Sequence, residues 1–205
     1  MKKLFLGSSF SDVAQLFPEW IEEDIKGKTV TFIPTAGVPE EITFFIDNDR
    51  KAFEQLGILV DELEISTAFR EEIKAKLLKN DYIFLSGGNT FFLLQELKRT
   101  RTDMLIKELI FAWKPYIWTS AGSMVLAPNI EYWALMDVPE KAPNLKDFSA
   151  LNVVNFYLVP HYGEFPFVDA TNEIVNRYTE LPLLPLNNKQ VVCINGETQK
   201  IKTTV

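Results

Sequence analysis

Histidine and cysteine are almost missing from this sequence, which has one residue of each among 205. The lone cysteine, Cys193, cannot form an intramolecular disulfide, and its isolation excludes zinc sites that are built from cysteine clusters. Cys193 lies in an apolar segment, so we expect it to be a buried packing residue. Histidine-rich metal sites are excluded in the same way, and any acid–base chemistry that needs an imidazole must use His161.

Long apolar runs and an excess of positive charge are also missing. No stretch approaches the roughly 18 apolar residues of a membrane span, and the apolar run at 4–6 ends too early for a signal peptide. The net charge of −7 disfavours contact with nucleic acid or an anionic membrane. The composition, 47% hydrophobic and 24% charged, is typical of a folded protein. We therefore expect one cytoplasmic domain over residues 1–205 that binds neither nucleic acid nor membranes; its oligomeric state is not predicted.

Short apolar segments alternate with segments of helical periodicity along most of the chain. This alternation predicts a mostly parallel sheet with helices on both faces, and so an α/β fold. Pro18 should delay or kink the first helix, residues 128–152 form a long irregular excursion, and Asn195-Gly196 favours a hairpin turn. Strands are predicted at 3–6, 29–34, 58–65, 81–85, 116–118, 156–161, 183–184 and 190–194, and helices at 11–25, 46–56, 69–78, 91–97, 102–113 and 168–178.

Ser120 is the candidate nucleophile. It follows a short apolar strand, and the small residues Ala121 and Gly122 come directly after it. A sharp strand-to-helix turn exposes a serine hydroxyl and directs the next backbone N–H towards an oxyanion. The local sequence is equally compatible with an ordinary serine N-cap of a helix.

Two further segments end predicted strands. The run Ser-Gly-Gly-Asn-Thr at 86–90, called the Gly-Gly loop below, could direct free N–H groups towards a ligand. It could also be an ordinary strand–helix turn. It lacks the glycine spacing and the lysine of nucleotide-binding loops. His161 could act as a general base, or it could be a structural polar group. Because Ser120, the Gly-Gly loop and His161 each follow a separate predicted strand, we expect them to meet at one edge of the sheet.

An acidic residue would orient the imidazole of a serine–histidine pair. The spacing of the chain does not choose among the candidates. They are Glu131, Asp137, Glu140 and Asp147 in the excursion, and Glu164 just after the histidine.

Three segments together resemble the peptidase E (aspartyl dipeptidase) family of serine peptidases, which is related to cyanophycinases. They are 84–91 (Phe-Leu-Ser-Gly-Gly-Asn-Thr-Phe), 120–122 (Ser-Ala-Gly) and 160–162 (Pro-His-Tyr). The likeness extends over nearly the whole chain. It implies a doubly wound sheet like that of the class I glutamine amidotransferases, with a serine at the position of their elbow cysteine.

The resemblance also implies roles for individual residues. Ser120 would be the nucleophile, His161 the base and Asp137 the acidic member, with Glu131 in reserve. The N–H groups of Gly88 and Ala121 would form the oxyanion hole. Asn89 and Asn172 are the candidate substrate-binding residues. A small peptide is the implied substrate, and no metal or organic cofactor is implied.

The sequence departs from the family at two positions. Trp118 stands where the family has the elbow glycine. Asn172 stands where aspartyl dipeptidases have an arginine that pairs with the N-terminal aspartate of the substrate, so that the charged partner is missing. These departures leave two alternatives to a peptidase: a non-catalytic binding module of the same fold, and an esterase or amidase that uses the same serine.

Overall fold

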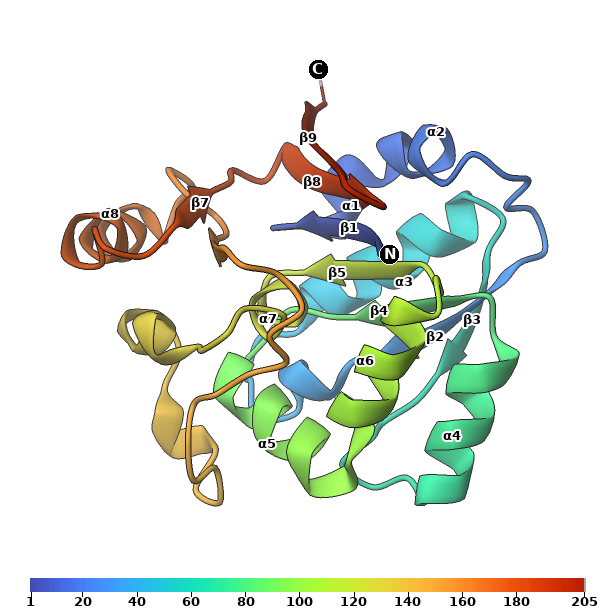
Figure 1. Cartoon of the computed structure of the whole chain (residues 1–205), viewed down its shortest axis with the longest axis horizontal. Coiled ribbons are helices and arrows are strands. Elements are labelled where there is room, and N and C mark those ends of the chain that lie inside the picture. Colours follow the sequence, from blue (N-terminus) through green and yellow to red (C-terminus); the bar gives the residue numbers. More distant parts are fainter. Residues whose placement is uncertain (205) are drawn as a thin grey trace.

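A computed structural model describes residues 1–204 of the chain. Its centre is a seven-stranded sheet in which five strands run parallel and two antiparallel strands complete one edge (Figure 1). This confirms the predicted α/β class with a mostly parallel sheet. In spatial order the strands are β3 (Leu59–Glu62), β2 (Thr29–Ile33), β4 (Tyr82–Leu85), β5 (Tyr116–Thr119), β1 (Lys3–Gly7), β8 (Gln190–Asn195) and β9 (Thr198–Thr203).

Helices cover both faces of this sheet, as Figure 1 shows. Residues alternate between the faces along each strand, so that Leu4 and Leu6 enter one core while Phe5 enters the other. One core packs against α4 (Arg70–Lys79), α5 (Thr90–Thr100) and α6 (Thr102–Phe111), and the other packs against α1 (Phe10–Val13), α2 (Phe17–Ile21) and α3 (Phe44–Gln55).

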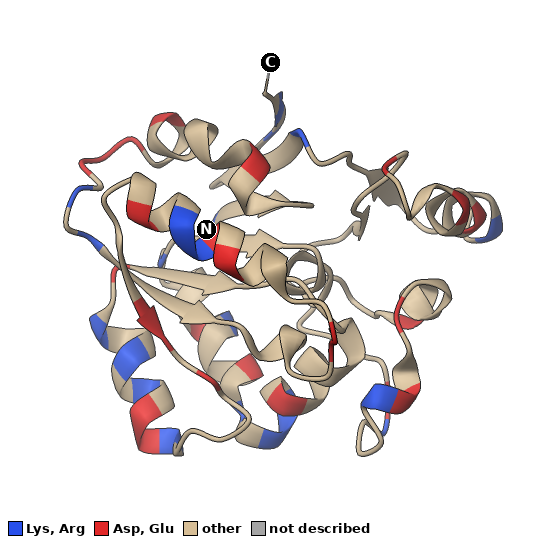
Figure 2. Ribbon diagram, turned by 180° about the vertical axis from the view of Figure 1, so that it is seen from behind, with Lys and Arg blue, Asp and Glu red and all other residues tan. Residues whose placement is uncertain are grey.

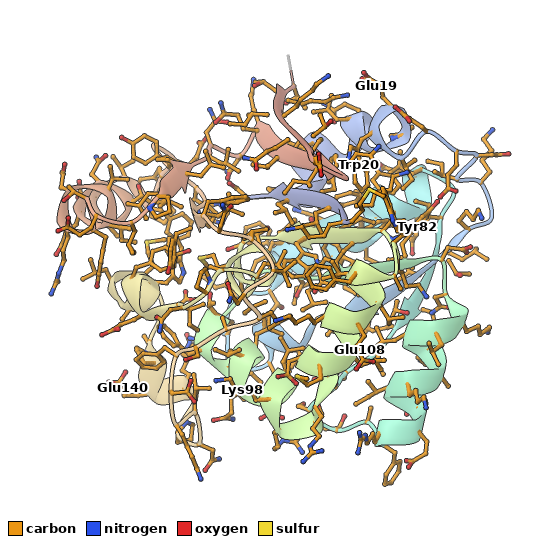
Figure 3. The ribbon with its side chains drawn as sticks, in the orientation of Figure 1. Glu19, Trp20, Tyr82, Lys98, Glu108 and Glu140 are labelled. Carbon is orange, nitrogen blue, oxygen red and sulfur yellow. The ribbon has the colours of Figure 1, made fainter. Side chains whose placement is uncertain are left out.

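Aromatic rings dominate the core under α1 to α3. The Phe17 ring lies 5.8 Å from Trp20 and 5.5 Å from Tyr82 between ring centroids. Trp20 and Tyr82 are labelled in Figure 3, on the α2 side of the sheet. Cys193 is 5% exposed in the same core, which confirms that it is a packing residue.

The predicted helix at 11–25 is replaced by two short α-helices. Residues Ala14–Leu16 form a 3₁₀ turn between α1 and α2, and Pro18 lies in the first turn of α2. Proline has no N–H and is tolerated only at the start of a helix, so it ends one helix and begins another. The Asn195-Gly196 turn is confirmed, and it leads into β9, a strand that the sequence pattern did not predict.

The predicted strand at 156–161 does not join the main sheet. It forms β6 (Tyr157–Val159), which pairs with β7 (Leu183–Pro185) in a separate two-stranded parallel sheet. The main sheet has no place for it beside β1, because β5 and β8 pair with both sides of that strand. In Figure 1, α8 (Val168–Arg177) and β7, which follows it, extend to one side of the main sheet.

The excursion at 128–152 lies over α5. It contains two 3₁₀ turns, Glu131–Leu135 and Pro139–Lys141. Lys98, labelled on α5 in Figure 3, forms an ion pair of 3.0 Å with Asp147 of the excursion. Because a long irregular segment is attached to the helix that follows the Gly-Gly loop, it can help to line a site at that edge.

Charges of both signs are spread over the surface. Figure 2 shows Lys and Arg interspersed with Asp and Glu on helices such as α4. Across residues 1–204, no helix has the length and apolar character that crossing a bilayer would need.

Candidate active site

Ser120 lies at the carboxyl end of β5, where the chain turns sharply into the one-turn helix α7 (Ala121–Met124). Its backbone has φ 46° and ψ −114°. A non-glycine residue in this region is strained by about 1–3 kcal/mol, and such strain concentrates at functional sites. The Ser120 N–H donates to the carbonyl oxygen of Gly7 over 3.0 Å, so the turn is anchored to the end of β1.

Small residues permit this turn because neighbouring backbone leaves no room for side chains. A Cβ on Gly122 would lie 2.6 Å from the carbonyl oxygen of Leu85. Trp118, the residue at the family's glycine position, is fully buried in the core that faces α4 to α6. Its bulk is therefore accommodated by the core.

The Gly-Gly loop follows β4, the strand next to β5. Gly88 has φ +129°, and a Cβ there would lie 2.2 Å from the carbonyl oxygen of Ala36. That carbonyl also accepts the N–H of Asn89 over 2.7 Å, which holds the loop against the segment after β2. Within residues 1–204, neither the Gly88 N–H nor the Ala121 N–H donates a hydrogen bond to another residue. Both amides can thus bind an oxyanion.

Asn89 caps helix α5. Its Oδ1 accepts the Phe92 N–H over 2.9 Å, its Nδ2 donates to the carbonyl oxygen of Val138 over 3.2 Å, and the residue is 1% exposed. We predicted Asn89 to bind substrate, but the structure gives its side chain a capping role, in which it supports the loop that carries Gly88.

The backbone of His161, which follows β6, is held by Ser8. The His161 N–H donates to the Ser8 hydroxyl over 3.1 Å, and Ser8 directly follows Gly7, the residue that anchors Ser120. Two consecutive residues, the last residue of β1 and the one that follows it, therefore hold the candidate nucleophile and the candidate base. Since β6 belongs to the second sheet, these contacts, rather than a shared sheet edge, join His161 to the site.

Within the described residues, the His161 ring has one hydrogen-bond partner, Asn188, in the connection between β7 and β8. The His161 Nδ1 and Asn188 Oδ1 atoms are 2.7 Å apart. Burial lowers the pKa of His161, although this hydrogen bond and the carboxylates of Glu164 and Asp12 act in the opposite direction. The imidazole is thus kept neutral near pH 7, as a general base must be.

Asp137, predicted as the acidic partner of His161, has a different partner in the structure. Its Oδ2 accepts the Thr90 N–H at the start of α5 over 2.7 Å. The imidazole nitrogen that a triad carboxylate would contact is bonded to Asn188 instead. Glu131, the reserve candidate, is exposed on a 3₁₀ turn of the excursion. A carboxylate at a helix N-terminus satisfies free N–H groups and the helix dipole, so Asp137 attaches the excursion to α5.

Replacing Asp137 with asparagine should flatten the pH dependence of stability. Burial raises the pKa of Asp137 from 3.8 to about 6. The folded protein therefore retains a proton that the unfolded chain has lost, and this contribution to stability is complete below pH 4 and is lost as the pH rises through 6. In the wild type, this loss should lower the free energy of unfolding by up to about 3 kcal/mol between pH 4 and 7. Asp137→Asn should not show this decrease, as measured by urea denaturation over the same pH range.

Asp147→Asn is the matched control for this measurement. The pKa of exposed Asp147 is lowered by its hydrogen bond with Lys98, so its small contribution has the opposite sign. Parallel stability curves for wild type and Asp137→Asn would contradict the prediction.

Two aromatic side chains flank the candidate nucleophile and base. The Phe45 ring and the Ser120 Cβ lie 3.7 and 3.3 Å from the point that a Cβ on Gly87 would occupy. The Phe167 ring lies 5.0 Å from the His161 ring between centroids. Asn172, the second predicted substrate residue, is exposed on α8. Across residues 1–204 no group of three or more His, Cys, Asp or Glu side chains could hold a metal ion.

Sequence reasoning missed Ser8 and Asn188. Ser8 had a usable signal, because it follows a buried strand in the same way as the Gly-Gly loop and Ser120 do. Asn188 had none, since the polar run Asn-Asn-Lys-Gln at 187–190 is typical of any surface turn.

The model of peptidase family S51 matches residues 4–202. The chain belongs to this family. It is therefore a peptidase, and the resemblance noted in three short segments extends over the whole fold.

Individual relatives agree with this membership. The chain is 54% identical to an uncharacterized peptidase of Pasteurella multocida, over 98% of both chains. It is 30% identical to the peptidase E of a Nostoc species, covering 78% of this chain and 66% of that one. A crystal structure from Listeria monocytogenes EGD-e, described as a candidate peptidase E, superposes with a TM-score of 0.96 at 50% identity over the full length of both chains. A peptidase from an acI-B1 actinobacterium shares the fold, with a TM-score of 0.73 at 20% identity over 100% of this chain and 88% of that one.

Proposed function

We propose that this chain is a serine peptidase that hydrolyses small peptides, with Ser120 as the nucleophile and His161 as the general base. The observation that carries the proposal is the strained turn at Ser120, which lies beside the Gly-Gly loop and is followed by a free amide. His161 takes the hydroxyl proton as Ser120 attacks the carbonyl carbon. The Gly88 and Ala121 N–H groups bind the oxyanion of the tetrahedral intermediate, and His161 then gives its proton to the leaving amine. Water hydrolyses the acyl-enzyme by the same steps.

Asn188 takes the position of the orienting residue in this proposal. An Nδ1–H that donates to Asn188 Oδ1 leaves the Nε2 lone pair free to accept the Ser120 proton. An amide fixes the ring but carries no charge to stabilise the imidazolium. That charge comes from Glu164, whose Oε1 accepts the Asn188 N–H over 3.3 Å, and from Asp12.

The proposed substrates are small peptides whose N-terminal residue is neutral and apolar. The charges that act on His161 come from two acidic residues, Glu164 and Asp12. They attract the ammonium group of a peptide and repel an acidic side chain. Phe45 and Phe167 provide apolar walls beside the reacting groups. Asn172 supplies no charge for the aspartate that other members of the family recognise.

A panel of dipeptides with aspartate, glutamate, apolar and basic N-terminal residues tests this proposal. We expect kcat/KM to be at least about tenfold higher for leucyl and phenylalanyl dipeptides than for aspartyl ones, because an unpaired buried carboxylate costs about 1–3 kcal/mol. The release of free amino acids gives the rates. Faster cleavage of aspartyl dipeptides would contradict the substrate class and leave the peptidase assignment intact.

A non-catalytic binding module is the second candidate function. Among residues 1–204 no hydrogen bond joins the Ser120 hydroxyl to His161, and this favours it. A fluorophosphonate probe separates the two candidates. Covalent modification that maps to Ser120 by mass spectrometry supports the peptidase, and unmodified protein supports the binding module.

A further inference from the structure

Asp49, on α3, is a buried carboxylate directly behind the Ser120 turn. It is 3% exposed and lies on the face of the sheet whose core is rich in phenylalanine. Its Oδ1 accepts the Ser11 N–H over 3.0 Å, and its Oδ2 accepts the Thr119 hydroxyl over 3.2 Å. Burial raises the pKa of Asp49 to about 7, because the charged carboxylate is unfavourable in this apolar core. An apolar side chain would fill the same position without that cost in free energy.

The two donors belong to the two halves of the candidate site. Thr119 is the residue before Ser120, at the end of β5. Ser11 lies in the first turn of α1, which begins just after the Gly7-Ser8 segment that holds Ser120 and His161. One carboxylate therefore connects the strand that carries the nucleophile with the loop that anchors the base.

We propose that Asp49 is a positioning residue of this peptidase, which through Thr119 and Ser11 fixes the Ser120 turn relative to the loop that holds His161. The proposal rests on the peptidase function proposed above. A strained turn persists only where its surroundings hold it, and here the Thr119–Asp49 hydrogen bond acts beside the Ser120–Gly7 bond. Capping of α1 would require only the Ser11 contact. Thr119 is 2% exposed, and its buried hydroxyl donates to Asp49. This contact is not needed to cap α1, so it indicates that Asp49 also holds the end of β5.

Thr119→Val tests the proposal, because valine has the shape of threonine but cannot donate to Asp49. Thr119→Ser is its matched control, since serine keeps the hydroxyl. The readouts are kcat and KM for the best dipeptide of the panel and the rate constant for fluorophosphonate modification of Ser120. We expect Thr119→Val to lower kcat and the modification rate constant by about ten- to a hundredfold with little change in KM, the size of effect that small misplacement of a reacting group produces. Thr119→Ser should restore most of both rates.

The rate constant is measured on the protein that reacts, so partial misfolding lowers the amplitude and leaves the constant interpretable. If Thr119→Val does not fold, Ser11→Pro removes the other donor. Ser11 lies in the first turn of α1, where its N–H has no acceptor within the helix, and the variant should lower the same rate constant. Wild-type rate constants in these variants would overturn the positioning role while Ser120 modification still supports the peptidase. Failure of wild-type protein to react at Ser120 would overturn the peptidase proposal itself.

Discussion

Replacing Ser120 with alanine is expected to lower kcat/KM for the best peptide substrate by about 10⁶-fold, the scale seen when a serine peptidase loses its nucleophile. The hydroxyl is the group that forms the covalent bond with the substrate in the proposed reaction, and among residues 1–204 no neighbouring side chain is placed to replace it in that role. The fold should be unaffected, because the backbone of Ser120, rather than its side chain, makes the contact with Gly7. Hydrolysis rates, fluorophosphonate modification and urea denaturation together check both statements.

Ser123→Ala is the matched control within the same short segment. The Ser123 hydroxyl donates to the carbonyl oxygen of Gly7 over 3.0 Å, and its loss should cost about 1 kcal/mol of stability. Most of the activity should remain, because this hydroxyl points to backbone. Undiminished hydrolysis by Ser120→Ala would refute the proposed mechanism, and equal losses in the two variants would show that the effect is structural.

Replacing Gly88 with alanine is expected to destabilise the protein by more than about 4 kcal/mol. The added Cβ would lie 2.2 Å from the oxygen and 2.3 Å from the carbon of the Ala36 carbonyl. Both atoms are backbone, so neither can rotate away as a side chain would. The loop would have to move, and the Asn89–Ala36 hydrogen bond and the proposed oxyanion donor would move with it.

Gly163→Ala separates the clash from the backbone conformation. Gly163 has φ +76° and has no heavy atom within 4 Å of an added Cβ, so only the conformational strain of about 1–2 kcal/mol should appear. Guanidinium denaturation of both variants gives the comparison. Equal stability of the Gly88 and Gly163 variants would show that the Ala36 segment gives way easily.

The strand-end argument predicted Ser120, Gly88 and His161 because each lies next to an apolar strand that is recognisable from its own residues. The choice of Asp137 as the acidic partner rests on family likeness and not on the strand ends. In the structure its carboxylate accepts the Thr90 N–H at the N-terminus of α5. Free N–H groups at a helix start are a strong competing partner, and nothing in the sequence near 137 reveals that this helix end is close in space.

Periodicity also could not predict how the strand before His161 would pair. The pattern gives an apolar strand at 156–161, and it contains no information about which neighbour that strand has. The pairing was decided by β8, which occupies the free side of β1 and leaves β6 to pair with β7.

The amino-acid sequence alone determined the fold class, the nucleophile candidate and the lack of any second imidazole, because these follow from local patterns and from counts. Only the tertiary structure decided that Asn188 contacts the imidazole, that Ser8 holds its backbone and that Asp49 lies behind the nucleophile. Those three residues come from a loop after the first strand, the third helix and a turn near the carboxyl terminus. Hydrogen bonds between such distant segments depend on how the helices, strands and loops pack against one another. That packing cannot be predicted from the spacing of residues along the chain.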